Sequence, residues 1–164
     1  MIAFAERAFA DATAARRSFL ATLVVLTLLR AWFAAALPFT SDEAYFLMWG
    51  RNPDWGFYDH PPMVGWWLAA LDAISGHRFV LRLPALLAPP LIAAIGWQLL
   101  RRHGEALAWS GATLLLMVPL SAWNVAITTD IPLMLFSGLT VALYLRARRT
   151  GRMHDYLWTG LALG

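Results

Sequence analysis

Long apolar runs are the feature that most limits what this chain can fold into. The first extends from about residue 18 to residue 37 (SFLATLVVLTLLRAWFAAAL), and a helix needs ~20 such residues to cross a bilayer. Further runs predict spans at about residues 83–100, 106–123 and 125–145, and the start of another near residue 156. We therefore expect an all-α, multi-pass transmembrane helix bundle, in which residues 1–164 are the N-terminal part of a single larger domain.

The composition supports a membrane setting and argues against other classes of protein. Only 14% of the residues are charged, against roughly 25% in soluble domains, and 60% are hydrophobic. The chain contains 13 Arg and no Lys, and these Arg residues lie at the ends of apolar runs rather than in one patch. We therefore expect membrane lipids, and no nucleic acid, as partners. The absence of Cys and of a glycine-rich phosphate-binding loop argues against a thiolate site and a nucleotide-dependent enzyme.

The distribution of Arg predicts an orientation in the membrane. With a cytoplasmic N-terminus, nine Arg residues lie on the cytoplasmic side, three lie outside, and Arg30 lies within a span. Positive residues are enriched on the cytoplasmic side, so this orientation is favoured. It places the loop of residues 40–82 outside. A cleaved signal peptide is the alternative at the N-terminus, but Arg30 and the bulky Trp32 and Phe33 disfavour it.

The outer loop, residues 40–82, is longer than a tether between two spans needs to be, and long loops are often functional. Within it, the stretch Pro61–Ile74 carries apolar side chains at helical spacing but is short for a span. We expect this stretch to form a helix that lies in the membrane interface. The loop also concentrates the acids of the outer side, which are Asp42, Glu43, Asp54, Asp59 and Asp72.

Asp42, Glu43 and Asp130 each allow a structural and a functional interpretation. The sequence Thr40-Ser41-Asp42-Glu43 has the spacing of a capping box, which would start a helix after Thr40. A carboxylate fixed at a helix start just outside the bilayer is also well placed for catalysis. Asp130 can likewise be the N-cap of the fourth span, or face the same outer cavity as Asp42.

Asp59 and His60 precede two prolines, a pattern that is typical of a turn. His60 can instead bind phosphate or, together with Asp59, a divalent metal. No third ligand lies close by in the sequence, so the metal site is the weaker hypothesis.

Two Arg residues lie at or within the predicted spans. Arg82 begins the second span, so it can reach the lipid headgroups or hold a lipid phosphate. Arg30 lies ~10 Å below the outer end of the first span, and a charge at that depth is costly and points to function. We expect Asp42 or Asp130 to be its partner, either in a site or in a structural ion pair.

Four motifs together resemble those of a known family. They are Ser41-Asp42-Glu43-Ala44-Tyr45, Tyr58-Asp59-His60-Pro61-Pro62, Arg82-Leu83-Pro84 and Thr129-Asp130-Ile131-Pro132-Leu133. Their order is similar to that in the bacterial glycosyltransferases related to protein O-mannosyltransferases and to the lipid A aminoarabinose transferase. The resemblance implies a GT-C fold whose first outer loop holds two helices along the membrane surface. It also implies a bacterial inner-membrane protein with its active site on the non-cytoplasmic side.

The resemblance further implies an inverting transfer of a sugar from a polyprenyl-phosphate donor to a lipid, glycan or protein acceptor. Asp42 matches the catalytic aspartate, which would act as general base on the acceptor hydroxyl, and Asp130 matches the acid of the second outer loop. No cofactor is certain, although a divalent metal is possible. Some relatives carry a Lys where this chain has His60, which weakens the role of that residue. The expected substrate-binding residues are Glu43, Tyr45, Asp59, His60, Arg82 and Arg30.

Two other functions fit parts of the pattern. A membrane transporter or assembly protein would use the charged residues as a structural or translocation network, but transporters bind near the bilayer midplane. A lipid-modifying hydrolase would share the cations that face phosphate. The concentration of polar residues in an outer loop favours the transferase.

Overall fold

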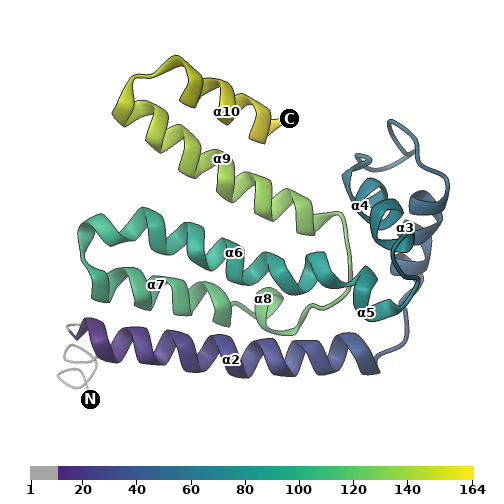
Figure 1. Ribbon diagram of the computed structural model, residues 1–164, viewed down its shortest axis with the longest axis horizontal. Helices are drawn as coiled ribbons and strands as arrows, with labels where there is room; N and C mark the ends of the chain where they lie inside the picture. The colour runs from purple at the N-terminus through teal and green to yellow at the C-terminus, as the bar shows by residue number, and fades with distance from the viewer. Residues whose placement is uncertain (1–10) are drawn as a thin grey trace.

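The computed structural model describes residues 11–164, and the regular elements in this part of the chain are helices (Figure 1). Arg7, one of the Arg residues expected on the cytoplasmic side, lies outside the described residues. The elements are α2 (Ala12–Ala36), α3 (Ser41–Arg51), α4 (Met63–Asp72), α5 (Arg78–Leu81), α6 (Leu83–Leu100), the 3-10 helix η1 (Arg101–His103), α7 (Glu105–Met117), α8 (Pro119–Trp123), α9 (Asp130–Thr150) and α10 (Met153–Leu163).

The longer helices form a row in the order α10, α9, α6, α7, α2, and each packs against the next (Figure 1). Alanines at the contacts, such as Ala93 and Ala112, are fully buried and let α6 and α7 approach closely. A second cluster of buried side chains joins the outer-loop helices to the bundle through Phe46, Trp49 and Leu68. The outer loop is therefore packed on the end of the bundle rather than tethered to it.

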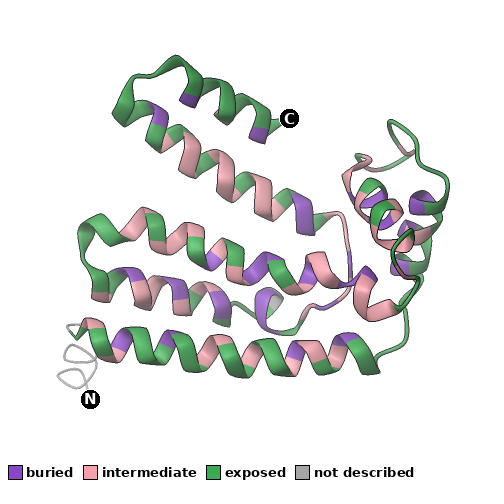
Figure 2. Ribbon diagram, viewed as in Figure 1, coloured by how far each residue is buried: buried purple, intermediate pink, exposed green. Residues whose placement is uncertain are grey.

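The expectation of an all-α, multi-pass bundle is confirmed. Within the described residues, three helices are long and apolar enough to cross a membrane: Ala12–Ala36, the continuous stretch Arg78–His103, and Asp130–Thr150. Large apolar side chains on their outer faces are exposed, such as Val25 and Leu28 of α2 (Figure 2). A surface of this kind is stable against lipid rather than water.

The predicted span over residues 106–123 is not one continuous helix. The helix α7 ends at Met117, because the next residue, Val118, precedes Pro119 and adopts an extended conformation with ψ 131°. The 13 residues of α7 extend about 20 Å at 1.5 Å per residue, which is short of the ~30 Å hydrocarbon core. The chain then forms the short α8 and returns to the outer-loop end of the bundle before α9.

The outer loop folds into two helices, α3 and α4, that pack on each other with their C-terminal ends together. Figure 1 shows them nearly end-on, so that their axes run across those of the bundle helices. An exposed ion pair between Arg51 Nε and Asp72 Oδ2, at 3.0 Å, joins the C-terminal ends of the two helices. This is the arrangement expected of helices that lie along a membrane surface, and it agrees with a GT-C bundle.

Candidate active site

The helix α3 begins with the capping box predicted at Thr40. The Thr40 side chain accepts a hydrogen bond from the Glu43 main-chain N–H at 3.2 Å, and Glu43 Oε2 accepts one from the Thr40 N–H at 3.0 Å. Asp42 lies in the same first turn, where the positive end of the helix dipole favours a carboxylate. The Asp42 residue is exposed, so a substrate can reach it.

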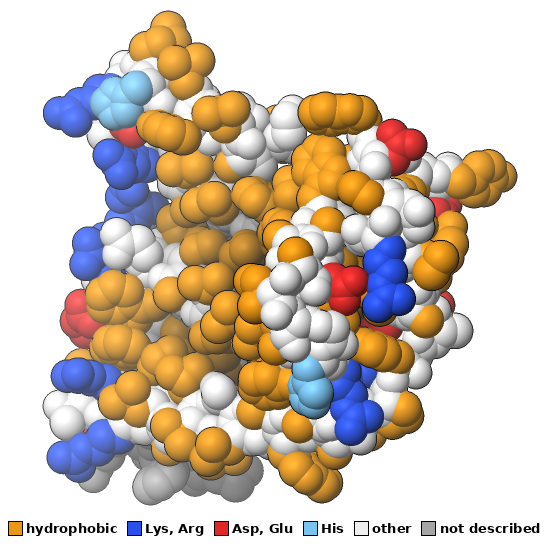
Figure 3. Space-filling model, turned by 45° about the vertical axis from the view of Figure 1, so that its right-hand side comes forward, with side chains coloured by type: hydrophobic (Ala, Val, Ile, Leu, Met, Phe, Trp, Pro, Cys, Tyr) orange, Lys and Arg blue, Asp and Glu red, His pale blue; other side chains and the backbone are white. Residues whose placement is uncertain are grey.

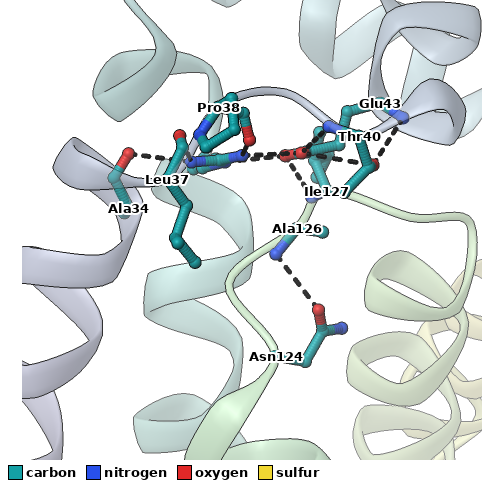
Figure 4. A network of polar contacts seen from close by, with 9 residues as sticks. Ala34, Leu37, Pro38, Thr40, Glu43, Asn124, Ala126 and Ile127 are labelled. Atoms are coloured by element: carbon teal, nitrogen blue, oxygen red, sulfur yellow. Dashed lines mark hydrogen bonds and ion pairs between the residues drawn. The ribbon is translucent and has the colours of Figure 1, made fainter.

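The Glu43 side chain, unlike that of Asp42, points into the protein and forms a buried ion pair with Arg82 of the α5–α6 junction. Glu43 Oε1 and Oε2 lie 2.7 Å from Arg82 Nε and Nη2, in the two-pronged geometry that makes such pairs strong (Figure 4). The two side chains are almost completely inaccessible, with 0% and 1% of their surface exposed. Glu43 Oε1 also accepts a hydrogen bond from the main-chain N–H of Ile127 at 3.3 Å.

These bonds set the charge state of Glu43. Burial alone would raise the pKa of the Glu43 carboxyl, but hydrogen bonds from Arg82, from the main chain of Thr40 and from Ile127 outweigh burial. The net effect lowers the pKa below its ordinary value of 4.5, so Glu43 is charged at neutral pH.

Arg82 has no free hydrogen-bond donor left for a ligand. Besides the two bonds to Glu43, Nη1 donates to the carbonyls of Ala34 and Leu37 at 3.0 and 2.9 Å, and Nη2 donates to Pro38 at 2.8 Å. The Ala34 carbonyl is available because Pro38, four residues on, lacks an N–H. Arg82 thus caps the C-terminal end of α2, and the expectation that it holds a lipid phosphate does not fit this geometry.

Arg30 is buried in the bundle, and the expected partners Asp42 and Asp130 are not bound to it. Instead Nη2 donates to the Ala85 and Asn124 carbonyls, at 2.5 and 3.0 Å, and Nη1 donates to the Leu86 carbonyl at 3.2 Å. The carbonyls of Ala85 and Leu86 lack their helical partners because the residues four positions later, Pro89 and Pro90, have no N–H. Arg30 therefore replaces the hydrogen bonds that the two prolines remove from α6.

Asp130 is the first residue of α9 and is exposed. The N-cap is Thr129, so the interpretation of Asp130 as the N-cap itself is wrong by one residue. The chain before it, residues 124–127, is held by Arg30 at the Asn124 carbonyl and by Glu43 at the Ile127 N–H. Asp130 thus follows a segment that two charged side chains of earlier helices fix in place.

Asp59 and His60 lie in the connection between α3 and α4. His60 Nδ1 is 3.2 Å from Asp59 Oδ2, although the angles do not make this contact a hydrogen bond. The His60 ring packs near Phe46 and Trp49, and Tyr45 lies edge-on against Trp49 with its ring half-exposed. Across residues 11–164, no three His, Asp or Glu side chains gather where they could hold a metal ion.

An apolar hollow of about 240 Å³ opens beside these groups, between the start of α4 and the helices α9 and α10. Its walls include Pro61, next to His60, and Thr129, next to Asp130. The remaining lining is largely apolar, with Val64, Phe136 and Leu161 among its residues. The hollow suits a hydrocarbon chain rather than a polar ligand.

The structure thus divides the predicted site residues into two groups. Asp42, Tyr45, Asp59, His60 and Asp130 are exposed or partly exposed at the outer-loop end of the bundle. The other three, Arg30, Glu43 and Arg82, are buried and bind main-chain groups, and Glu43 and Arg82 also bind each other. The contacts with Asn124 and Ile127 were not predicted, and the sequence carries no signal for them. The two adjacent prolines could have indicated that the Ala85 and Leu86 carbonyls need a donor such as Arg30.

This fold and site define a polytopic helical membrane protein with acidic residues presented at one end of the bundle. Residues 59–164 match the sequence profile of the dolichyl-phosphate-mannose-protein mannosyltransferase family, so the chain belongs to that family. It is also 28% identical, over 134 residues, to the lipid A galacturonosyltransferase RgtD of Rhizobium johnstonii. That similarity covers 79% of this chain but only 28% of the relative's length. No solved structure matches the chain significantly.

Proposed function

We propose that the full-length protein is a membrane glycosyltransferase that moves a sugar from a polyprenyl-phosphate donor to a hydroxyl group of a lipid, glycan or protein acceptor. The observation that carries this proposal is the exposed Asp42 carboxylate in the first turn of α3, in a chain of the mannosyltransferase family. The active site would lie on the non-cytoplasmic side of a bacterial inner membrane, because the outer loop carries few Arg residues.

In the proposed reaction, Asp42 accepts the proton of the acceptor hydroxyl as its oxygen attacks the anomeric carbon. The bond from that carbon to the lipid phosphate breaks, its electrons stay with the phosphate, and the anomeric configuration inverts. Asp130 and Tyr45 would orient the acceptor and the sugar from α9 and α3. Asp59 would assist His60, or bind a divalent metal if the reaction uses one.

The departing phosphate needs a cation. Arg82 has every donor bound, and Arg30 is buried in the bundle with its Nη groups bound to main-chain carbonyls. His60 is the predicted residue that can still serve, because its side chain is partly exposed. Arg78, at the start of α5, is a second choice: its side chain forms no hydrogen bond or ion pair with another residue of the described part. The apolar hollow beside His60 and Asp130 would take part of the isoprenoid chain.

The test is product analysis with a radiolabelled lipid-linked sugar and the full-length protein, comparing wild type with Asp42→Asn. A transferase gives labelled acceptor, a hydrolase gives free sugar without acceptor, and a transporter leaves the donor chemically unchanged. Asp42→Asn loses the interaction of an exposed carboxylate with the helix dipole, which contributes roughly 0.3–1 kcal/mol, so the variant should fold within ~1 kcal/mol of wild type. Because an amide cannot accept the proton, transfer should slow at least ~100-fold. Near-normal transfer by a well-folded Asp42→Asn protein would remove Asp42 from the reaction.

A further inference from the structure

The Glu43 carboxylate joins three segments that are far apart in the chain. It binds the start of α3 through Thr40, the α5–α6 junction through Arg82, and the segment before α9 through Ile127 (Figure 4). Both carboxylate oxygens carry two or more of these contacts, and the side chain is fully buried. Glu43 therefore has no capacity left to bind a substrate.

The segments that meet at Glu43 are those that carry the two proposed acids. Asp42 is its neighbour in the first turn of α3. Asp130 follows Ile127 by three residues and begins α9. A rigid first turn on one side and a short stretch of chain on the other thus connect the Glu43 carboxylate to both exposed acids.

A second clamp limits how the segment before α9 can move. Arg30 holds the Asn124 carbonyl at 3.0 Å, while Glu43 holds the Ile127 N–H at 3.3 Å. The side chain of Asn124 adds a local turn by accepting a hydrogen bond from the Ala126 N–H at 3.1 Å. The segment of residues 124–127 is therefore fixed at both ends, and the Glu43 contact is the one that ties it to α3.

We propose that Glu43, held by Arg82, is a positioning residue that fixes Asp42 and Asp130 relative to each other for the transfer reaction. This inference rests on the proposed function. A displacement of about 1 Å in a catalytic group can cost on the order of 10²-fold in rate, so a shared anchor for the two acids has a direct effect on turnover. The donor and the acceptor would not touch Glu43, so their binding should depend on it much less.

The test uses Glu43→Gln and Glu43→Asp in the full-length protein. Glutamine keeps the size but loses the charge, whereas aspartate keeps the charge and is too short to reach Arg82, Thr40 and Ile127 together. For each variant we expect kcat, per folded protein, to fall at least ~10-fold, while the donor KM stays within about twofold. If Glu43→Gln fails to fold, Glu43→Asp alone tests the proposal, because its carboxylate still balances the charge of Arg82. The matched control is Asp72→Asn, which removes a carboxylate from the exposed Arg51 pair of the same loop and should leave kcat unchanged.

A distance measurement separates positioning from a direct role. Spin labels at Met48 of α3 and Leu133 of α9, both exposed, report how the two segments sit relative to each other. We expect a narrow distance distribution in wild type and Asp72→Asn, and a broadened or shifted one in both Glu43 variants. A normal kcat with an altered distribution, or a reduced kcat with an unaltered one, would overturn the inference. A wild-type protein that transfers no sugar would overturn the proposed function and the catalytic part of this inference, whereas the distances would still show whether Glu43 joins the segments.

Discussion

At the scale of single residues, the Glu43–Arg82 pair shows how this protein buries charge. Removing two ions from water costs several kcal/mol each, and their attraction offsets that cost only when further hydrogen bonds complete the geometry. Here the Arg82 guanidinium binds three carbonyls beyond Glu43, and the carboxylate binds two main-chain N–H groups beyond Arg82. Hydrogen bonds therefore compensate both charges for their removal from water, and loss of either partner leaves the other charge buried without a counter-charge.

This pair predicts a pH dependence of stability. Because the pKa of Glu43 is lower in the folded protein than its ordinary 4.5, its contribution is present above that value and is lost as the pH falls through the folded-state pKa. Glu43→Gln should therefore cost about 3 kcal/mol at pH 7, and the difference from wild type should shrink in acid. Unfolding by SDS in mixed micelles, measured from about pH 7 down to the acid limit of the protein, checks this prediction. A difference that stays constant across that range would show that the charge of Glu43 does not stabilise the fold.

The same residues show what the sequence could and could not predict. The capping box was predictable because Thr40 and Glu43 are three residues apart and form their bonds within one turn. The partner of Glu43 lies 39 residues away, and the contacts of Arg30 lie 55 to 94 residues away. Arg30 binds main-chain carbonyls, which every residue has. Its positive charge alone therefore suggested the acids Asp42 and Asp130, to which it is not bound.

At the scale of secondary-structure elements, proline determines where a helix lacks backbone hydrogen-bond donors and where a helix ends. The end of α7 before Pro119 follows from a local steric rule, so the sequence could have given this boundary. The helix α6 instead continues through Pro89 and Pro90, although both residues remove a helical hydrogen bond. It can do so because Arg30 of α2 supplies the missing donors from outside the helix.

This compensation predicts an energetic coupling between α2 and α6. Arg30→Met leaves the Ala85 and Leu86 carbonyls without donors, at a cost of ~1–3 kcal/mol for each buried group. In a Pro89→Ala/Pro90→Ala background, the new N–H groups can bind these carbonyls within the helix, so Arg30→Met should cost at least ~1 kcal/mol less. A double-mutant cycle, measured by SDS-induced unfolding of the full-length protein, gives the coupling energy. Equal costs in the two backgrounds would mean that Arg30 does not act through the proline-freed carbonyls.

At the scale of the whole molecule, charge is divided between the two ends of the helix row. Figure 3 shows hydrophobic side chains across the middle of the surface and Arg side chains along its left edge. The chain turns from α6 to α7 at Arg101 and Arg102, and from α9 to α10 beside Arg149 and Arg152. The outer-loop helices α3 and α4 lie at the opposite end (Figure 1). One Arg-rich end and one acidic end, with an apolar surface between them, is the distribution that the positive-inside rule associates with a defined orientation.

This division predicts the topology of the full-length protein, which single cysteines can test. Asn52 and Ala73 are exposed at the ends of α3 and α4, whereas His103 and Met153 are exposed at the Arg-rich end. These positions avoid Gly104 and Gly151, whose positive φ angles would strain a cysteine. In intact cells, cysteines at Asn52 and Ala73 should react with a membrane-impermeant thiol reagent, and those at His103 and Met153 should react only after the membrane is opened.

The short helix α7 makes this experiment informative about the fold as well as the orientation. The turn at His103 lies between α6 and α7, and α7 alone is too short to cross the hydrocarbon core. If α7 and α8 together still return the chain to the outer side, His103 and Met153 are both protected, and Asn52 and Ala73 are both labelled. Labelling of His103 from outside would place the end of α6 on the non-cytoplasmic side and reverse the orientation on which the proposed site depends. Protection of His103 with labelling of Met153 would keep α6 as predicted and show that either the α7–α8 segment or α9 does not cross.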